Sequence, residues 1–520
     1  MESVSLVPPD SPVCVILRHH GGVIGVGTAS VGSSNPVAES ARNAFKEVSD
    51  NNIVRRLDPE LRKFAMATVS IELELGAKPE PSPSKNLDRI SQSINKGIDG
   101  VAVRKRGKWA LRLPAELRLA PNQNTAITLE SLCIEVGVHP ATALSRHLSP
   151  SDDVTLYTFP TITIVQDSIG EPIRRLVRGD EIVDATEITM TTINHTADLI
   201  ATHLITCTND AGLVVGGYQP ETDSLAPPHA TVFVQVLVAT ALDAYLSNEF
   251  AANKDDAMAA TANILANISN RFADDSIIAD SVAAAIVILG NSNNQLQKNM
   301  HTLYDRCEQQ VLDVCHQLVH ENNVTKKPHV ISMLADAAAS IAVNGKDPIV
   351  NELAQKMCAT CIRTIPLESQ IATIPWLVDA VSKVFDQGLQ KSSMQQLLSL
   401  AISSQINEEG DLFGGFSLVS GDSTVADARG VRMLPMLALF AQLPNPSQSK
   451  AIPALKNSLR FVMQLTTRSQ RASRFSNPTL SKGGVRAATW DASMPTEVSA
   501  MALLGVSRAI KAFKVASGAR

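Results

Sequence analysis

The chain has 520 residues, of which 44% are hydrophobic, and this length exceeds one typical core and predicts two or more domains. Its formal charge of −5 at pH 7 gives no reason to expect non-specific binding to nucleic acid. Aromatic residues make up only 4% of the chain while alanine, leucine and isoleucine are abundant, which favours helices over a β-sandwich.

The N-terminal stretch "MESVSLVPPDSPVCVILRHH" lacks the basic start and long apolar core of a signal peptide. No run approaches the roughly 18 uninterrupted apolar residues that suggest a membrane span. Seven scattered cysteines fit reduced thiols better than a disulfide framework. We therefore expect a cytoplasmic protein that does not associate with a membrane.

The first third mixes short strands with short helices. In chain order, the predicted elements are strands in "PVCVILRH" and "VIGVGTA", a helix in "NPVAESARNAFKEVS", a strand in "ATVSIELEL", a hairpin in "GVAVRKRGKWALRLP", a helix in "TLESLCIEVGV" and a strand in "DVTLYTFPTITIVQD". Because strands and helices do not alternate strictly, the pattern predicts an α+β domain over residues 1–170.

A charged connector, "EPIRRLVRGDEIVDATE", supplies a predicted linker over residues 171–190, and strand signals largely end there. Helical patterns then follow one another, most of them separated by helix-stopping sequences such as "LGNSNN" and "LPNPSQS". The twelve predicted helices are Thr192–Thr206, Val232–Leu246, Ala257–Ile268, Ile277–Leu289, Leu296–Val319, Ile331–Val343, Ile349–Ile365, Thr373–Phe385, Met394–Ile406, Val431–Leu443, Ala451–Leu465 and Thr496–Phe513.

Twelve consecutive helices are most simply six antiparallel hairpins, which must stack to bury their apolar faces. Such a stack can stay open as a solenoid or close into a ring. The stretches "VFVQVLVATALDAYL" and "SVAAAIVILG" are apolar on more than one face, which suits inner helices packed on both sides. We therefore predict a closed α/α ring over residues 191–520.

The glycine-rich stretch "HHGGVIGVGTAS", residues 19–30, invites comparison with a phosphate-binding loop. Gly25 and Gly27 satisfy G-x-G, but Ser30 occupies the third glycine position and no helix pattern begins there. The Gly-Lys-Ser/Thr of a Walker loop is also missing. The glycines more simply predict a tight turn and a strand that passes close to neighbouring backbone.

The order of motifs in the first third resembles the AMMECR-type domain. The resemblance rests on "GVIG", "VAESARNAFKE", "VSIELEL", "GVAVRKRGKWALRLP" and "LESLCIEVGV", and it covers roughly residues 12–167. The family usually shows Arg-Gly-Cys-Ile-Gly at the glycine stretch, whereas Gly21 and Val23 stand here, so any role of that arginine or cysteine is lost. The family association implies Memo-like and radical-SAM proteins as partners.

Three loops between helical patterns carry a glycine pair: "DAGLVVGGYQPETD", "EEGDLFGGFS" and "SKGGVRAATWDASMP". Gly-Gly lets the backbone turn tightly where side chains would clash. In a ring of hairpins these loops should gather at one end and line a central pocket.

The helical part resembles the six-hairpin α/α-toroid superfamily, which includes terpene cyclases, prenyltransferase β-subunits and many sugar-processing enzymes. The resemblance is carried by "GDLFGGF" with "ADARGVRMLPMLALF" and by "GGVRAATWDASMPTEVSAMALLGV". The Asp-x-Asp-Asp acid of cyclising enzymes and a prenyltransferase-type zinc set are absent from the sequence, which argues against those two activities.

Charged and aromatic residues of the loops are the candidate site. Asp427 and Asp491 form the candidate catalytic pair of carboxylates for a hydrolase, although such residues also often cap helices. The other candidate ligand-binding residues are Tyr218, Asp223, Arg429, Arg432, Arg486, Trp490 and Glu497.

Two spacings resemble metal sites but favour no metal. "CATC" at Cys358–Cys361 lacks a second cysteine pair, and "CHQLVH" with His316 and His320 lacks the glutamate of H-E-x-x-H. We therefore expect no cofactor. Two functions stay open: a binding or accessory protein for a polar, carbohydrate-like or peptide ligand, and a toroid hydrolase, lyase or epimerase acting on a sugar-containing substrate.

Overall fold

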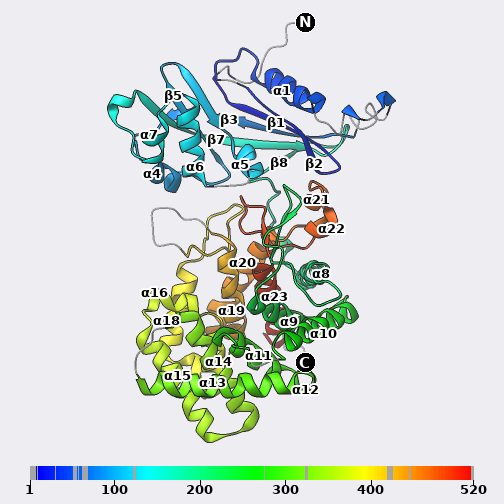
Figure 1. Ribbon diagram of the computed structural model, residues 1–520, viewed down its shortest axis with the longest axis vertical. Helices are drawn as coiled ribbons and strands as arrows, with labels where there is room; N and C mark the ends of the chain where they lie inside the picture. The colour runs from blue at the N-terminus through cyan, green and yellow to red at the C-terminus, as the bar shows by residue number, and fades with distance from the viewer. Residues whose placement is uncertain are drawn as a thin grey trace.

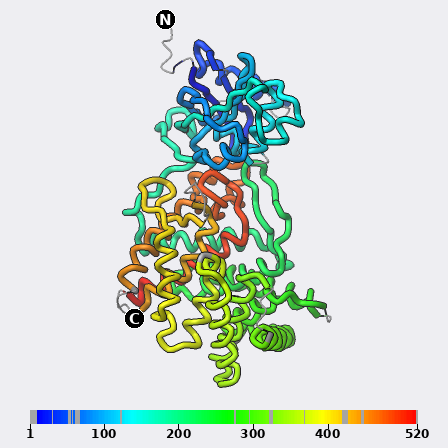
Figure 2. The backbone as a smooth tube through the Cα atoms, turned by 90° about the vertical axis from the view of Figure 1, so that its left-hand side faces the viewer, coloured from blue at the N-terminus to red at the C-terminus, as the bar shows by residue number. Residues whose placement is uncertain are grey.

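The computed structural model has a β-sheet region from the first third of the sequence and a helical region from the remainder (Figure 1). Seen from the side, the sheet region sits on one end of the helical region (Figure 2). This layout agrees with the predicted order of an α+β part followed by a helical part. The described residues are 8, 10–29, 31–50, 55–56, 58–60, 68–120, 124–273, 276–321, 326–418, 426–443 and 447–516.

One antiparallel sheet organises the first region, with the strand order β2-β1-β3-β7-β5-β6 and the short β4 and β8 paired to β7. The 13-residue strand β7 pairs with β5 through its first half and with β3 through its second half, so it joins two halves of a curled sheet. The strands are β1 (Val13–His19), β2 (Gly22–Thr28), β3 (Ser70–Gly76), β4 (Glu80–Pro81), β5 (Asp99–Lys105), β6 (Lys108–Arg112), β7 (Val154–Gln166) and β8 (Arg174–Leu176).

Helices cover both halves of this sheet. The helix α1 packs on β1 and β2, while α4, α6 and α7 pack together near β5 around a core that includes Leu87, Leu129 and Leu156. The helices are α1 (Pro36–Asp50), α4 (Leu87–Ser93), α5 (Pro114–Leu119), α6 (Thr125–Glu135), α7 (Pro140–Leu144) and the 3-10 turn η1 (Pro150–Asp152).

The glycines of β2 allow α1 to approach closely. A Cβ on Gly25 would lie 2.4 Å from the Ala44 carbonyl oxygen, and a Cβ on Gly27 would lie 2.1 Å from the Ser40 carbonyl oxygen. Any side chain at either position would therefore collide with the backbone of α1. The interpretation of this stretch as a strand passing close to neighbouring backbone is confirmed; Ser30 lies outside the described residues.

The helical region has helices at all twelve predicted places, but the predicted helix Leu296–Val319 is divided into two at Met300. Six inner helices are α9 (Val232–Leu246), α11 (Asp280–Ser292), α14 (Pro328–Gly345), α17 (Trp376–Val384), α19 (Met433–Ala441) and α23 (Thr496–Ala516). Six outer helices are α8 (Met190–Thr206), α10 (Lys254–Arg271), α13 (His301–Glu321), α15 (Pro348–Thr364), α18 (Ser392–Ser403) and α20 (Ser447–Leu465). Shorter helices are α12 (Asn294–Asn299), α16 (Leu367–Gln370), α21 (Ser469–Ala472) and α22 (Pro478–Ser481), with 3-10 turns η2 (Ala185–Glu187), η3 (Ile371–Thr373), η4 (Gly388–Gln390) and η5 (Ala428–Arg432).

The helices close on themselves. The last helix, α23, packs against α8 and α9, the first two of the region, and also against α19. The helix pairs α9 with α11, α11 with α14, and α14 with α17 continue the contacts on the other side. In α14 the residues from Ile331 to Ala342 are all buried, as an inner helix requires. Between α17 and α19 the circuit is completed by η4, α18 and α20, so the helices form a closed ring and not an open arc.

The three glycine-pair loops gather at one end of this ring. Each is held by an equivalent isolated bridge: Thr208 with Val214, Gln405 with Phe416, and Thr466 with Val485. The first and third loops share a small sheet, in which β9 (Gly217–Gln219) lies between β10 (Ser224–Leu225) and β11 (Met494–Pro495). The segment that follows the second loop is joined to the third loop by the Ala428 amide, which donates to the Ala487 carbonyl at 2.9 Å. The expected gathering of these loops at one end is confirmed, but the cavity on the ring axis is lined by residues outside all three loops.

The connector at residues 171–190 is folded onto both regions. Its β8 extends the sheet, and its Val183 and Ile188 belong to the core of the helical ring. Among the described helices, none combines the length and the apolar character needed to cross a membrane.

Candidate functional site

The predicted carboxylate pair is engaged within its own turns. The Asp427 side chain accepts a hydrogen bond from the Arg429 amide at 2.9 Å and forms an ion pair with the Arg429 guanidinium at 2.6 Å. The Asp491 carboxylate accepts bonds from the Ser493 amide and hydroxyl at 2.9 and 2.6 Å. Asp427 thus caps the 3-10 turn η5, and Asp491 closes a turn with Ser493, which leaves catalysis by Asp427 and Asp491 a prediction.

Two predicted ligand-binding residues are structural. Tyr218 is only 1% exposed and its hydroxyl donates to Asp223 at 2.7 Å, so its ring is no free stacking surface. Arg486 is fully buried and donates to the carbonyls of Leu465 and Thr489 and to the Asp180 carboxylate. These groups hold the loops of the ring together.

Arg432, Arg429 and Glu497 lie near Asp427 at the loop end of the ring. Burial lowers the pKa of the Arg432 guanidinium, Glu497 opposes this shift, and Arg429 adds to it. Trp490 lies at the junction of the two regions, where its Cβ lies against Gly97 and its ring lies 5.9 Å from the Lys96 ammonium. Its turn is joined to that of Asp427, because the Ala428 amide donates to the Ala487 carbonyl at 2.9 Å.

The cysteine and histidine motifs lie on outer helices. Cys358 and Cys361 are buried in α15, and burial raises the pKa of the Cys361 thiol to about 12. In α13, His316 and His320 are exposed while Cys315 is buried. Within the described part of the chain, no group of three or more His, Cys, Asp or Glu side chains is arranged to hold a metal.

A large crevice lies where the sheet region meets the ring. Its volume is about 910 Å³, and its walls come from the end of α4 and the following loop, from the connector, and from the second glycine-pair loop. The lining residues are Ser93, Ile94, Asn95, Ile98, Val177, Arg178, Ile182, Ser403, Ser404, Gln405, Ile406, Asn407, Glu408, Glu409, Gly410, Asp411, Leu412 and Ser417. Both regions therefore contribute to one site.

A buried ion pair joins the two walls of this crevice. The Arg178 guanidinium contacts the Asp411 carboxylate, and its Nε donates to the Lys96 carbonyl at 2.7 Å. Asp411 is 4% exposed, and its Oδ2 has no hydrogen-bond donor among the described residues. Arg178 is thus neutralised, whereas the exposed Glu408 and Glu409 add negative charge to the rim. The crevice is acidic with apolar patches.

A second, narrower cavity lies on the axis of the ring, between α9, α11, α14, α17 and α23. Its charged groups form two ion pairs: Lys383 Nζ with Asp336 at 2.7 Å, and Arg508 Nη1 with Asp379 at 2.8 Å. Burial raises the pKa of Asp336 to about 6, with Asp379 adding to the rise and Lys383 opposing it. The Asp336 Oδ2 has no partner among the described side chains or backbone.

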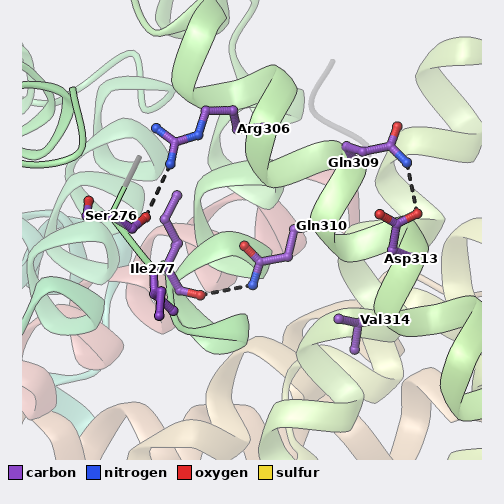
Figure 3. Close-up of a pocket in the computed structure, with 8 residues that line it drawn as sticks. Ser276, Ile277, Arg306, Gln309, Gln310, Asp313 and Val314 are labelled. Atoms are coloured by element: carbon purple, nitrogen blue, oxygen red, sulfur yellow. Dashed lines mark hydrogen bonds between the residues drawn. The ribbon is translucent and has the colours of Figure 1, made fainter. Parts of the chain in front are cut away.

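A third depression, of about 480 Å³, lies between residues 276–278 and α13 (Figure 3). Its polar side chains are occupied with the chain itself. Arg306 donates to the Ser276 carbonyl at 3.2 Å, and Gln310 donates to the Ile278 carbonyl at 2.9 Å. These bonds fasten the segment before α11 onto the ring, so the groove has a structural explanation.

No family model matches this sequence. No curated protein matches it in sequence either. The chain is similar in structure to the uncharacterised protein PH0010 from Pyrococcus horikoshii, with 19% identity and a TM-score of 0.24 over 34% of this chain and 86% of that one. It is also similar to an inactive variant of the α-1,6-mannanase GH76A of a Salegentibacter species, solved in complex with α-1,6-mannotetrose, with 10% identity and a TM-score of 0.44 over 62% of this chain and 99% of that one.

Sequence reasoning missed the axial charges and the residues that line the crevice. Asp336 stands alone in the apolar stretch "ISMLADAAASIAV", which was the one available signal for a buried carboxylate. The crevice residues gave no comparable signal, because Asn95 and Asp411 meet only in the folded chain.

Proposed function

We propose that this protein is a binding or accessory protein, and that its crevice holds a basic, partly apolar peptide segment of a partner protein. The observation that carries the proposal is the shared acidic crevice of about 910 Å³ between the two regions. Exposed Glu408 and Glu409 attract lysine and arginine side chains, while Ile94, Ile98 and Ile406 offer apolar contacts.

The charge of the lining supports a basic ligand over an acidic one. Its single arginine, Arg178, is already paired with Asp411, so no free cation faces an incoming carboxylate or phosphate among the lining residues described. No aromatic side chain occurs among these lining residues, which speaks for a peptide over a sugar that needs a stacking surface.

Fluorescence anisotropy with a labelled short Lys/Leu peptide and its Glu/Leu counterpart tests this proposal. The basic peptide should bind and the acidic one should not. The double variant Glu408→Gln/Glu409→Gln should weaken binding about three- to tenfold, since each rim charge contributes a few tenths to 1 kcal/mol.

The matched control is Asp255→Asn/Asp256→Asn, which removes an adjacent pair of exposed carboxylates on α10, outside the crevice lining. This variant should bind like the parent protein. Equal binding of both peptides, or an unchanged affinity in the Glu408/Glu409 variant, would refute the proposal.

A second candidate is hydrolysis of a sugar-containing substrate at the axial cavity, whose volume of about 30 Å³ would have to increase to admit a sugar ring. Such a reaction needs one protonated and one ionised carboxyl group. Asp336, with its pKa raised to about 6, suits the acid, and Asp379, held by Arg508, suits the ionised partner. Hydrolysis of aryl glycosides that is abolished by both Asp336→Asn and Asp379→Asn would support it; activity retained in both variants would exclude it.

We also propose that the ring is a six-hairpin α/α-toroid and that the sheet region is an AMMECR-type domain. The pairing of six outer with six inner helices supports the first assignment. The assignment of the sheet region as an AMMECR-type domain is supported only by the order of its sequence motifs. The Memo-like and radical-SAM partners that this assignment implies remain predictions. Pull-down of purified partners of these two kinds, with the Glu408→Gln/Glu409→Gln variant as control, tests whether either one uses the crevice.

A further inference from the structure

Four buried arginines meet at the junction of the two regions, at a place separate from the crevice. Arg18 comes from β1 and Arg118 from α5 of the sheet region, while Arg471 lies in α21 of the ring and Arg474 lies two residues after the end of α21. Their exposed fractions are only 5–8%. In Figure 1, α21 lies directly beneath β2 and next to this junction.

The arginine side chains outnumber the carboxylates that line the cavity with them. Together with Glu72 and Glu221 they line one small cavity, so four guanidinium groups face two carboxylates there. Arg18 pairs with Glu221 at 3.0 Å, and Arg118 pairs with Glu72. Farther out, Arg474 contacts Asp167 at 3.1 Å, and Arg471 lies 3.5 Å from Asp180, which Arg486 also uses.

Each arginine keeps one buried nitrogen without a hydrogen-bond acceptor in the described part of the chain. These atoms are Arg18 Nε, Arg118 Nη1, Arg471 Nε and Arg474 Nη1. An unsatisfied buried donor is expensive, and more so when it is charged. Four such donors around one cavity therefore indicate a missing acceptor.

On the ring side of the cavity the electrostatics agree with a shortage of negative charge. On the sheet side, burial lowers the pKa of the Arg118 guanidinium, but Glu72, Glu74 and Glu221 outweigh burial and raise it. Burial opposes ionisation of Glu72, yet Arg118, Arg18, Arg474 and Arg471 together hold its pKa below the usual value. Burial lowers the pKa of Arg471 to about 9, and Arg486, Arg474 and Arg118 add to that fall against the opposing Asp180. An additional anion would relieve this repulsion.

The cavity is small, with a volume of about 10 Å³, so the guanidinium groups must move apart to admit an anion larger than water. Gly179 lines the cavity with a φ of +78°, and a Cβ there would lie 3.2 Å from the guanidinium carbon of Arg118. Only glycine adopts this conformation readily while leaving the arginine unobstructed.

From this geometry we propose that Arg18, Arg118, Arg471 and Arg474 bind one tetrahedral oxyanion, phosphate or sulfate, which bridges the sheet region and the ring. Its oxygens accept the four orphaned N–H groups in charge-assisted hydrogen bonds. Because two of the arginines come from each region, the bound anion stabilises their junction. The site shares no lining residue with the peptide crevice, although Gly179 directly follows the crevice residue Arg178.

Thermal unfolding of the full chain in phosphate or sulfate, against sodium chloride of equal ionic strength, tests the site. Millimolar oxyanion should raise the Tm by about 2–4 °C in a saturable manner, whereas general salting effects grow without saturation. Arg118→Gln and Arg474→Gln should each abolish this increment. The exposed Arg89→Gln on α4 is the matched control and should retain it.

Crystals of the unaltered protein soaked in selenate provide a second measurement if the variants fail to fold. An anomalous peak between the four guanidinium groups is expected. A cavity that holds only water, or an oxyanion-dependent Tm rise that persists in Arg118→Gln, would overturn the proposal.

Discussion

At the residue scale, His203 shows how burial sets a protonation state. The ring of His203 has no exposed surface; its Nδ1 lies 2.9 Å from the Leu480 carbonyl and its Nε2 lies 3.7 Å from Cys207 Sγ. Burial lowers the pKa of His203 to about 4, against the opposing bond to Leu480. The imidazole is therefore neutral in the folded chain at neutral pH, and Nδ1 donates its hydrogen to the carbonyl.

This neutral histidine predicts a pH dependence of stability. Between pH 6.5 and 4 the unfolded chain binds a proton on His203 that the folded chain does not, so the contribution of this residue falls as the pH falls. From pH 7 to pH 5 the loss should be about 2 kcal/mol, since each unit of pKa difference is worth about 1.4 kcal/mol. Urea unfolding of His203→Gln at both pH values should show a correspondingly smaller loss than the parent protein.

The control for this comparison is His195→Gln, which alters an exposed histidine on the same helix, α8. It should leave the loss between pH 7 and pH 5 unchanged. If His203→Gln loses as much stability as the parent, the neutral state of the buried imidazole is wrong.

At the element scale, helix α14 is joined to α17 by the pair of Asp336 and Lys383. Removing the cation by Lys383→Met leaves a buried carboxylate without its nearest partner, which should raise the pKa of Asp336 further. We expect the free energy of unfolding to fall by about 2–3 kcal/mol at pH 8. This loss is at or below the lower end of the range for broken buried ion pairs, because the Lys383 side chain is a third exposed.

Calorimetric unfolding checks this expectation. Since the folded pKa of Asp336 is raised, the deficit of Lys383→Met is largest above that pKa and should shrink as the pH falls toward 5. The surface pair of Lys356 and Glu352 on α15 supplies the control, and Lys356→Met should cost less than about 0.5 kcal/mol. A deficit as small as that of the control would contradict the role given to the axial pair.

The helices were predictable from sequence because their signals are local. The predicted helix Val232–Leu246 coincides with α9 at both ends, since Thr231 caps its start and its apolar pattern is unbroken. The short α16, α21 and α22 were missed because four residues are too few to establish a period. Pairing of β8 with β7 was also missed, because the connector carries no strand pattern of its own.

The sites were less predictable because they join residues far apart in the sequence. Glycine pairs correctly indicated loops that meet at one end of the ring. Which charged side chains face a cavity depends on non-local packing: Arg18 donates to the Arg474 carbonyl at 3.1 Å across 456 positions of the chain. Periodicity and motif spacing describe nearby positions and do not predict contacts between residues so far apart in the sequence.

At the scale of the whole molecule, the turn between β1 and β2 contacts the ring through Gly21. Its φ is +78°, and a Cβ at this position would lie 2.1 Å from the Phe475 carbonyl oxygen. Gly21→Ala should therefore push the sheet region away from the ring, lowering the Tm and making the connector at residues 171–190 more susceptible to proteolysis.

Gly107→Ala isolates the effect of the contact. Gly107 has nearly the same φ, +83°, but a Cβ there would meet nothing within 4 Å. Both substitutions introduce the same backbone strain. The additional loss of stability in Gly21→Ala therefore measures the contact between this turn and the ring alone. Similar losses in the two variants would mean that this turn does not hold the regions together.

Hydrogen exchange of the full chain with and without the basic Lys/Leu peptide tests most directly whether the two regions form one shared binding site. We expect the peptide to slow exchange in residues 93–98 of the sheet region and in residues 403–412 of the ring together, because both line the crevice. Protection confined to one of these segments, or appearing only elsewhere in the chain, would contradict it.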